Sequence, residues 1–318
     1  MNILETITER TKERIAGEKR NIPLTEIRAR AEQAAQTGIH RRAEQAAQTE
    51  THKRAEQAAQ VKQKAAAKKE PPCAKHCEAD LSAFLPFEAA LRAPGLSFIC
   101  EVKKASPSKG LIAPDFPYLD IARDYEAAGA AAISCLTEPY WFKGSDRYLE
   151  EIVSQTSIPV LRKDFTCDEY MIYQAKALGA SAILLICSVL DDAQLAAFHS
   201  LASELRLSAL VETHSEEEIE RAQRIGASII GVNNRNLKDF TVDIQNSIRL
   251  RKLVDSDTVF VSESGITGAK DMRALYENGT DAVLIGELLM RSGDRREALA
   301  ALKRDVDLKT DVDMGKTE

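Results

Sequence analysis

The hydrophobic pattern of the chain changes near residue 80. From there to about residue 305, short apolar, β-branched runs alternate with longer stretches in which apolar residues recur at helical spacing. The runs predict strands, as in AILLIC, SALVET and AVLIG, and the predicted strands begin at residues 98, 132, 159, 182, 208, 229, 259 and 282. Stretches such as YLDIARDYEAAGA and DDAQLAAFHSLASELR predict the helices between them.

This alternation predicts an α/β fold, a (β/α)8 TIM barrel spanning residues 80–306. Three of its helices are expected to stop at Gly129, Gly179 and Gly226, since glycine readily adopts the left-handed backbone that ends a helix. A doubly wound open sheet is the alternative. That fold is expected to carry a glycine-rich turn after its first strand, whereas EVKKASPSKG follows here.

Residues 1–79 predict a helical, repeat-containing extension of the barrel. A 12-residue unit rich in Ala, Glu, Gln and Arg begins at Arg30, Arg42 and Arg54. Twelve residues rotate a helix by 120° between copies, so the copies do not form one apolar stripe. We interpret the repeats as a spacer, with self-association through a coiled coil as the alternative. Pro71 and Pro72 end any helix there, and residues 307–318 predict a polar tail.

Composition suits an enzyme-sized globular protein, because 44% of the 318 residues are hydrophobic and 29% are charged. No apolar run is long enough to span a membrane and no signal-peptide core is present, so we expect a cytoplasmic protein. Residues 1–70 carry 15 Lys or Arg against 10 Asp or Glu, although the net charge of the chain is −6. No stacking aromatic residues accompany these cations, which argues against nucleic-acid binding.

The six cysteines mostly lie inside apolar runs, which predicts reduced, buried thiols. Only Cys73 and Cys77, with His76 between them, suggest a metal site. A zinc site usually takes four ligands from two such clusters, and no second cluster is present. We therefore predict no metal and no cofactor.

Charged and polar residues gather where the predicted strands end. A single charged residue at a strand end, such as Lys163 in IPVLRKDF, can be explained by a strand that reaches the solvent there. In a TIM barrel, however, the carboxyl ends of all strands meet at one mouth, where the chemistry is done. The residues at these ends are Glu101, Lys103, Lys163, Glu212, Asn233, Arg235, Glu263, Ser264 and Gly286.

The last two strand ends predict a phosphate site. Ser264 and Gly265 precede a helix expected to start near Thr267, and Gly286 opens the final helix. Glycine lets the backbone approach a ligand, and helix N-termini direct free N–H groups at an anion. The competing interpretation is that these glycines only make tight turns.

Seven motifs resemble those of the indole-3-glycerol phosphate synthase family, in the family's order. They are EVKKASPSKG, LTEPYWFKG, VLRKDF, LVETH, GVNNRNL, VSESGI and VLIGELLM, and the match as a whole runs from about residue 80 to 305. The start of the chain, ILETITERTKERIAGEKRNIPLTEI, resembles the family's N-terminal helix. The resemblance implies ring closure of a carboxyphenylamino-deoxyribulose 5-phosphate, with loss of carbon dioxide and water, in tryptophan biosynthesis.

The resemblance also implies roles for individual residues. Lys163 matches the general acid, for which an ammonium with a pKa lowered by burial is suited. Glu212 matches the residue of the dehydration step, and Lys103 a lysine that holds the anionic substrate. Glu101 and Glu263 would orient the lysines. The remaining matches are substrate-binding (Ser106, Phe142, Asn233, Arg235 and Ser264) and phosphate-binding (Gly265, Gly286 and Glu287).

Two other functions stay open. Phosphoribosylanthranilate isomerase, a barrel enzyme of the same pathway, uses a Cys and an Asp and would not need lysines after strands one and three. A scaffold with an idle barrel would not need Lys103, Lys163 and Glu212. In the family the N-terminal helix lies over the barrel mouth, and the inserted repeats leave open whether residues 4–20 reach it.

Overall fold

The structure, a computed structural model, describes residues 3–37, 83–236 and 239–307 of the chain. Most of the repeats, Cys73, His76, Cys77 and the predicted tail lie outside these residues. The predictions made for them, including self-association, therefore stay predictions. In the described part, residues 24–37 are helical, which covers the beginning of the first repeat copy.

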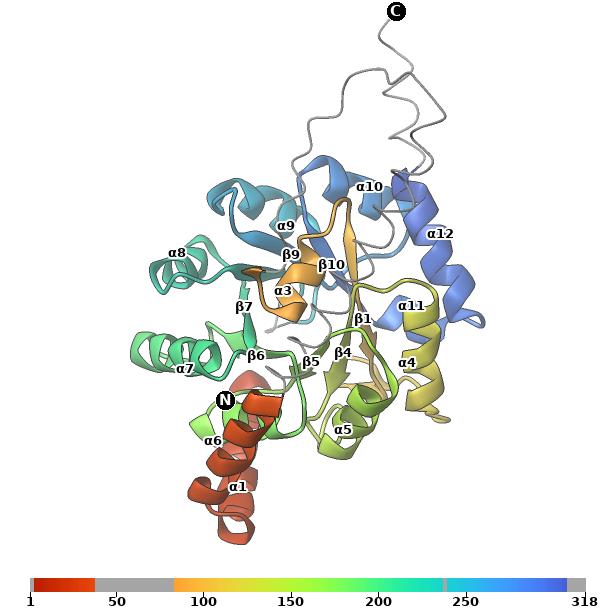
Figure 1. The fold of residues 1–318 in the computed structure, drawn as a ribbon. Helices are drawn as coiled ribbons and strands as arrows, with labels where there is room; N and C mark the ends of the chain where they lie inside the picture. The colour runs from red at the N-terminus through yellow and green to blue at the C-terminus, as the bar shows by residue number, and fades with distance from the viewer. Residues whose placement is uncertain (1–2, 38–82, 237–238, 308–318) are drawn as a thin grey trace, which may run out of the picture.

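Eight parallel strands close into a barrel, which confirms the predicted fold (Figure 1). Each strand begins within one residue of its predicted start. The strands are β1 (Ser97–Val102), β4 (Ala132–Leu136), β5 (Val160–Lys163), β6 (Ala182–Ile186), β7 (Ser208–Thr213), β8 (Ile229–Asn233), β9 (Val259–Glu263) and β10 (Ala282–Ile285). They pair in this chain order, and β10 closes the ring against β1.

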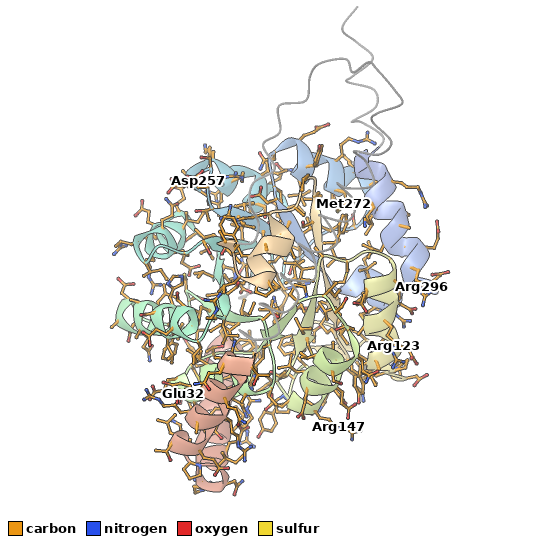
Figure 2. All side chains as sticks on the ribbon, in the orientation of Figure 1. Glu32, Arg123, Arg147, Asp257, Met272 and Arg296 are labelled. Carbon is orange, nitrogen blue, oxygen red and sulfur yellow. The ribbon has the colours of Figure 1, made fainter. Side chains whose placement is uncertain are left out.

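Helices surround the barrel and alternate with its strands. They are α4 (Tyr118–Ala127), α5 (Asp146–Gln155), α6 (Glu169–Ala177), α7 (Asp192–Glu204), α8 (Glu216–Arg224), α9 (Gln245–Leu250) with a 3-10 turn at Arg251–Leu253, α10 (Ala269–Glu277), α11 (Glu287–Arg291) and α12 (Arg295–Asp307). Gly129, Gly179 and Gly226 follow α4, α6 and α8 with positive φ angles, as predicted. Charged residues such as Arg123, Arg147 and Arg296 cover the outside of this layer (Figure 2).

Two apolar layers hold the barrel together. The outer layer lies between strands and helices and includes Tyr125, Leu149 and Met272, all fully buried. The inner layer fills the barrel with side chains such as Ile99 and Leu161. Helix α3 (Pro86–Leu91) contributes Phe87 to this layer and packs on β1, β4 and β7. The barrel is therefore a packed core, and only the end where the strands finish is left for chemistry.

Helix α1 (Ile3–Asn21) packs across the barrel end opposite α3. Ile7, Thr11 and Ile15, spaced four residues apart, form its buried face. At its other end Lys19 lies 2.6 Å from Asp168 at the start of α6. The docking that the sequence left open is thus present in the structure, despite the insertion between α1 and the barrel.

One pair of strands was not predicted. Between β1 and α4, β2 (Ala105–Ser106) and β3 (Gly110–Leu111) form a short antiparallel hairpin. The segment ASPSKG gave no indication of these strands in the sequence, because two-residue strands leave no periodic signal. The hairpin brings Ser106 to the rim of the active-site cavity.

Candidate active site

A cavity of about 690 Å³ lies at the carboxyl ends of the strands, beneath α1. It is lined by most of the residues that the sequence placed there: Glu101, Lys103, Ser106, Phe142, Lys163, Glu212, Asn233, Arg235, Ser264, Gly265 and Glu287. Glu263 and Gly286 lie directly behind this lining, in contact with Lys163 and Glu101 respectively. The structure therefore brings all thirteen predicted residues to one end of the barrel.

Lys163 is the most enclosed cation of the cavity. Its Nζ donates to Glu263 Oε2 at 2.7 Å and lies 3.7 Å from Glu212 Oε2. Burial by itself lowers the pKa of Lys163, but the charges of Glu263, Glu212 and Glu101 outweigh burial and raise this pKa above its ordinary value. The prediction of a pKa lowered by burial was therefore wrong, because three carboxylates from other strands surround the ammonium.

Burial also acts on the carboxylates. It raises the pKa of the Glu263 carboxyl above its ordinary value, against the opposing effect of the Lys163 charge. For Glu101 the balance is reversed. Burial again raises its pKa, but the ammonium groups of Lys103 and Lys163 outweigh burial and lower it. The two carboxyls therefore differ in how readily they take up a proton.

Lys103 is held by a second ion pair in the same cavity. Its Nζ lies 2.5 Å from Glu101 Oε1, and both side chains are largely buried. Gly286 leaves the space for this pair. A Cβ atom on Gly286 would come within 2.5 Å of Glu101 Oε1 and 3.1 Å of Lys103 Nζ. The close approach of two side chains thus requires glycine here, a reason the sequence could not reveal.

The loop after β4 positions Phe142. Three successive N–H groups donate to the carboxylate of Glu138, the last being that of Phe142 at 2.9 Å. The ring of Phe142 lies 6.2 Å from that of Phe165, measured between centroids. Glu138 is almost fully buried and was missed, because nothing in TEPYWF indicates that its carboxylate bonds backbone.

The polar groups after β8 have defined partners. Asn233 Oδ1 accepts the backbone N–H of Arg235 at 3.0 Å, and the Arg235 guanidinium donates to the carbonyl of Phe240 at 3.4 Å. Arg235 lines the cavity together with Ser264 and Gly265. A cation therefore faces the turn that was predicted to bind phosphate.

The turn that was predicted to bind phosphate has an unusual backbone conformation. Ser264 and Gly265 have φ angles of 66° and 86°, so two successive residues adopt a left-handed backbone. Helix α10 begins at Ala269, later than the predicted start near Thr267. The N–H groups close to Ser264 thus belong to the turn rather than to the helix.

The phosphate-binding role predicted for Glu287 fits its backbone but not its side chain. Its carboxylate lies 3.1 Å from Arg291 and 3.7 Å from Lys109, both of which line the cavity. A carboxylate repels phosphate, so only the backbone N–H of Glu287, at the start of α11, fits the predicted role. Lys109 and Arg291 were missed as cations of this site, since neither lies at a strand end.

Helix α1 completes the cavity. Ile3, Leu4 and Ile7 line it, and they are the only lining residues among those described that precede the barrel. Arg14 anchors the helix through Asp164 Oδ2 at 2.8 Å, with 10% and 1% of the two side chains exposed. Asp164 follows Lys163 directly. The position of α1 is therefore tied to the strand that carries the most enclosed lysine.

Among the described residues, no group of three or more His, Cys, Asp or Glu residues could hold a metal ion. The described cysteines, Cys100, Cys135, Cys167 and Cys187, are free and buried, as predicted. Among the described helices, none is long and apolar enough to cross a membrane.

A closed parallel barrel with paired lysines and glutamates at the ends of its strands defines the class, a (β/α)8-barrel enzyme. A family model described as indole-3-glycerol phosphate synthase matches residues 43–302. The chain belongs to the indole-3-glycerol phosphate synthase family. Its function is that of a carboxy-lyase of tryptophan biosynthesis, as the sequence predicted.

Similar proteins agree with this assignment. The indole-3-glycerol phosphate synthase of Ruminiclostridium cellulolyticum is 60% identical over 217 residues, which are 68% of this chain and 84% of that protein. The one of Endomicrobium trichonymphae is 58% identical over 220 residues, 69% of this chain and 85% of that protein. Among solved structures, a thiamine phosphate pyrophosphorylase from Pyrococcus furiosus shares the fold, with a TM-score of 0.51, 17% identity, and 67% of this chain and 96% of that chain covered.

Proposed function

We propose that Lys163 is the general acid of ring closure in this chain, acting on 1-(2-carboxyphenylamino)-1-deoxy-D-ribulose 5-phosphate. The observation that carries the proposal is the position of its ammonium, held by Glu263 at 2.7 Å at the inner end of the cavity. Protonation of the substrate carbonyl makes its carbon electrophilic, and the aromatic carbon that bears the carboxylate then attacks. Loss of carbon dioxide restores the aromatic ring.

Glu212 is proposed to serve the dehydration that follows. A base must take a proton from the carbon next to the ring nitrogen, and an acid must assist the departing hydroxyl. Glu212 lies 3.7 Å from Lys163, so one carboxylate and one ammonium can act on neighbouring atoms of the same intermediate. Both are largely buried, which strengthens electrostatic effects in the site.

Lys103 and Glu101 are proposed to hold the substrate carboxylate and its chain. The Lys103 ammonium is fixed by Glu101 at 2.5 Å and faces the cavity. Phe142 would offer an apolar wall to the anthranilate ring. Ser106, Asn233, Arg235 and Ser264 would bind the hydroxyls and position the chain.

The phosphate is proposed to sit at the left-handed turn of Ser264 and Gly265 and at the backbone N–H groups near Gly286 and Glu287. Such a turn and a helix start direct N–H groups at an anion. Arg235, Lys109 and Arg291 line the same cavity and favour a dianion there. The substrate is accordingly a phosphorylated small molecule, and the free thiols of the four cysteines in the described part of the chain are consistent with a cytoplasmic location.

Lys163→Ala tests this proposal. We expect the variant to lose the fluorescence increase that accompanies indole-3-glycerol phosphate formation, by at least about 100-fold in kcat. Lys104→Ala is the matched control, because Lys104 is a neighbour of Lys103 that does not line the cavity. Its kcat should stay within about twofold of the parent. Retained turnover in a folded Lys163→Ala variant would reject Lys163 as the acid.

A further inference from the structure

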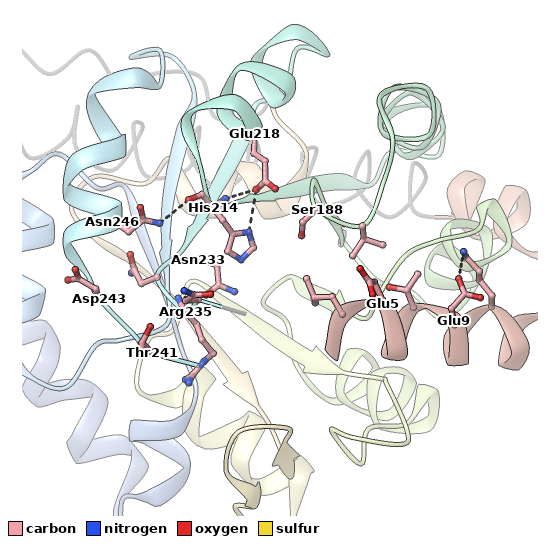
Figure 3. Close-up of a pocket in the computed structure, with 16 residues that line it drawn as sticks. Glu5, Glu9, Ser188, His214, Glu218, Asn233, Arg235, Thr241, Asp243 and Asn246 are labelled. Atoms are coloured by element: carbon pink, nitrogen blue, oxygen red, sulfur yellow. Dashed lines mark hydrogen bonds and ion pairs between the residues drawn. The ribbon is translucent and has the colours of Figure 1, made fainter. Parts of the chain in front are cut away.

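A second cavity, of about 720 Å³, lies beside the active-site cavity and shares Leu4, Asn233 and Arg235 with it. It is bounded by the first turns of α1 and by the ends of β6 to β8 (Figure 3). Across it, Glu5 and Glu9 of α1 face the residues that follow β7. His214 lines this second cavity and lies 3.7 Å from Glu212, which lines the active-site cavity.

His214 lies between two carboxylates. Its Nδ1 is 3.3 Å from Glu218 Oε2, and its Nε2 is 3.7 Å from Glu212 Oε1. Nε2 is buried and has no hydrogen-bond partner in the part of the chain that the structure describes. The imidazole therefore presents a free nitrogen to the carboxylate that we assign to dehydration.

Hydrogen bonds to the backbone N–H and carbonyl of His214 fix the position of this residue. Glu218 Oε2 also accepts the N–H of His214 at 2.7 Å, and Asn246 Nδ2 donates to the carbonyl of His214 at 3.3 Å. Ser215 caps α8 by accepting the N–H of Glu218 at 3.3 Å. Glu218 thus has a structural role in the helix start, and a test must separate that role from any effect of its charge.

The chemistry of the reaction requires a proton from outside. The substrate carboxylate leaves as carbon dioxide, and the carbonyl oxygen leaves as water. One hydrogen of that water comes from the carbon next to the ring nitrogen, and the other must come from solvent. Each turnover therefore consumes one proton, while the mouth of the active site lies beneath α1.

We propose that Glu218 and His214 conduct this proton from the second cavity to Glu212, which passes it to Lys163. His214 accepts a proton at Nδ1 from the solvated Glu218 side and releases one from Nε2 to Glu212 Oε1. The other carboxylate oxygen, Oε2, lies 3.7 Å from Lys163 Nζ. His214 acts through Glu212 and does not touch the substrate, so the inference rests on the function proposed above.

The charges around His214 suit this task. Burial by itself lowers the pKa of His214, but Glu218, Glu212 and Glu263 outweigh burial and raise it above its ordinary value. The charged residues that line the second cavity are Glu5, Glu9 and Lys12 of α1, Glu218 of α8, and Arg235 and Asp243 after β8. A histidine can accept a proton at one ring nitrogen and donate one from the other during turnover.

His214→Gln tests the relay by steady-state kinetics. We expect kcat to fall about 10- to 100-fold, with KM within about twofold of the parent, because the proton consumed in each turnover is replaced more slowly. Added imidazole, which is much smaller than the second cavity, should restore most of the rate in the variant and leave the parent unchanged. His199→Gln, at a half-buried histidine of α7 that lines neither cavity, is the control. An unchanged rate, or a loss that imidazole does not restore, would overturn the proposal.

Glu218→Gln provides the second readout, also if His214→Gln does not fold. The amide oxygen still accepts the N–H of His214, so the helix start is kept while the charge is lost. Because Glu218 raises the pKa of His214, the alkaline limb of the rate profile should move to lower pH. A profile identical to the parent's would reject the relay.

Glu212→Gln separates this inference from the proposed function. A fully active Glu212→Gln variant would reject the assigned role of Glu212, and the relay would lose its end point. An inactive Glu212→Gln variant beside a fully active His214→Gln variant would reject the relay alone.

Discussion

Lys163 and Glu263 lie 100 residues apart in the sequence, yet the ammonium of one lies 2.7 Å from the carboxylate of the other. They end β5 and β9, which are opposite each other in the eight-stranded ring. The barrel thus brings an acid and its counter-charge together from strands that never pair. This contact also raises the pKa of Lys163 in the free protein.

Glu263→Gln should weaken catalysis and change its pH dependence. Without this charge the pKa values of Lys163 and His214 both fall, and because each must carry a proton to act, the alkaline limb of kcat should move to lower pH. We expect kcat to fall about 10- to 100-fold at neutral pH, since the acid also loses its anchor. Stopped assays of kcat across the pH range measure both effects.

The matched control for this change is Glu88→Gln. Glu88 is also a buried carboxylate, but it lies on α3 at the opposite end of the barrel and bonds Arg92 and Ser228. Its substitution should leave the pH profile of kcat in place. A Glu263→Gln variant with the parent's alkaline limb would show that neither Lys163 nor His214, whose pKa Glu263 also raises, controls that limb.

Arg14→Ala should loosen α1 from the barrel. The Arg14–Asp164 pair is buried, and removing Arg14 leaves the Asp164 carboxylate with only the more distant guanidinium of Arg162, 3.7 Å away, at a cost of about 3 kcal/mol in the free energy of unfolding. Because α1 lines the cavity, KM should rise as well. Urea unfolding and steady-state kinetics measure these effects.

Arg10→Ala on the same helix is the control for α1. Arg10 is exposed and pairs with Glu13, so its loss should change neither the unfolding midpoint nor KM noticeably. Equal effects from Arg10→Ala and Arg14→Ala would contradict the anchoring role of the Asp164 contact.

Gly286→Ala should damage the site sterically. The added methyl group would meet Glu101 Oε1 at 2.5 Å, so the Glu101–Lys103 pair must shift or the backbone must move. Overpacking of this kind costs about 1–3 kcal/mol, and we expect kcat/KM to fall at least about tenfold. Gly293→Ala, where a Cβ atom meets nothing within 4 Å, should behave as the parent. Full activity of Gly286→Ala would mean that the pair adapts freely.

The lowered pKa of Asp164 predicts how the free energy of unfolding depends on pH in the acid range. Burial raises the pKa of its carboxyl, but Arg14 and Arg162 outweigh burial and hold this pKa below its ordinary value. The group therefore contributes stability above its unfolded pKa of about 3.9, and the contribution is lost as pH falls through the lower folded value. In Asp164→Asn the free energy of unfolding should vary less across this acid range than in the parent. Asp120→Asn, at an exposed residue, should keep the parent's slope.

Local pattern was sufficient to predict the barrel. Strand and helix periods of 2 and 3.6 residues are properties of short stretches, and each strand start was found within one residue. The two-residue strands β2 and β3 are too short for any period and were missed. The residues at the strand ends could be predicted because a parallel barrel sends all of those ends to one face.

What the sequence by itself determined is therefore the order of elements, the family and the set of residues at the mouth of the barrel. Only the tertiary structure decided which of them touch: Lys163 with Glu263, Arg14 with Asp164, and His214 between Glu212 and Glu218. The pKa of Lys163 is also decided by the tertiary structure, because it reflects a balance between the burial of its ammonium and the charges of carboxylates on other strands. Periodicity is encoded in neighbouring residues, whereas distances and charges across a cavity depend on how the whole barrel closes.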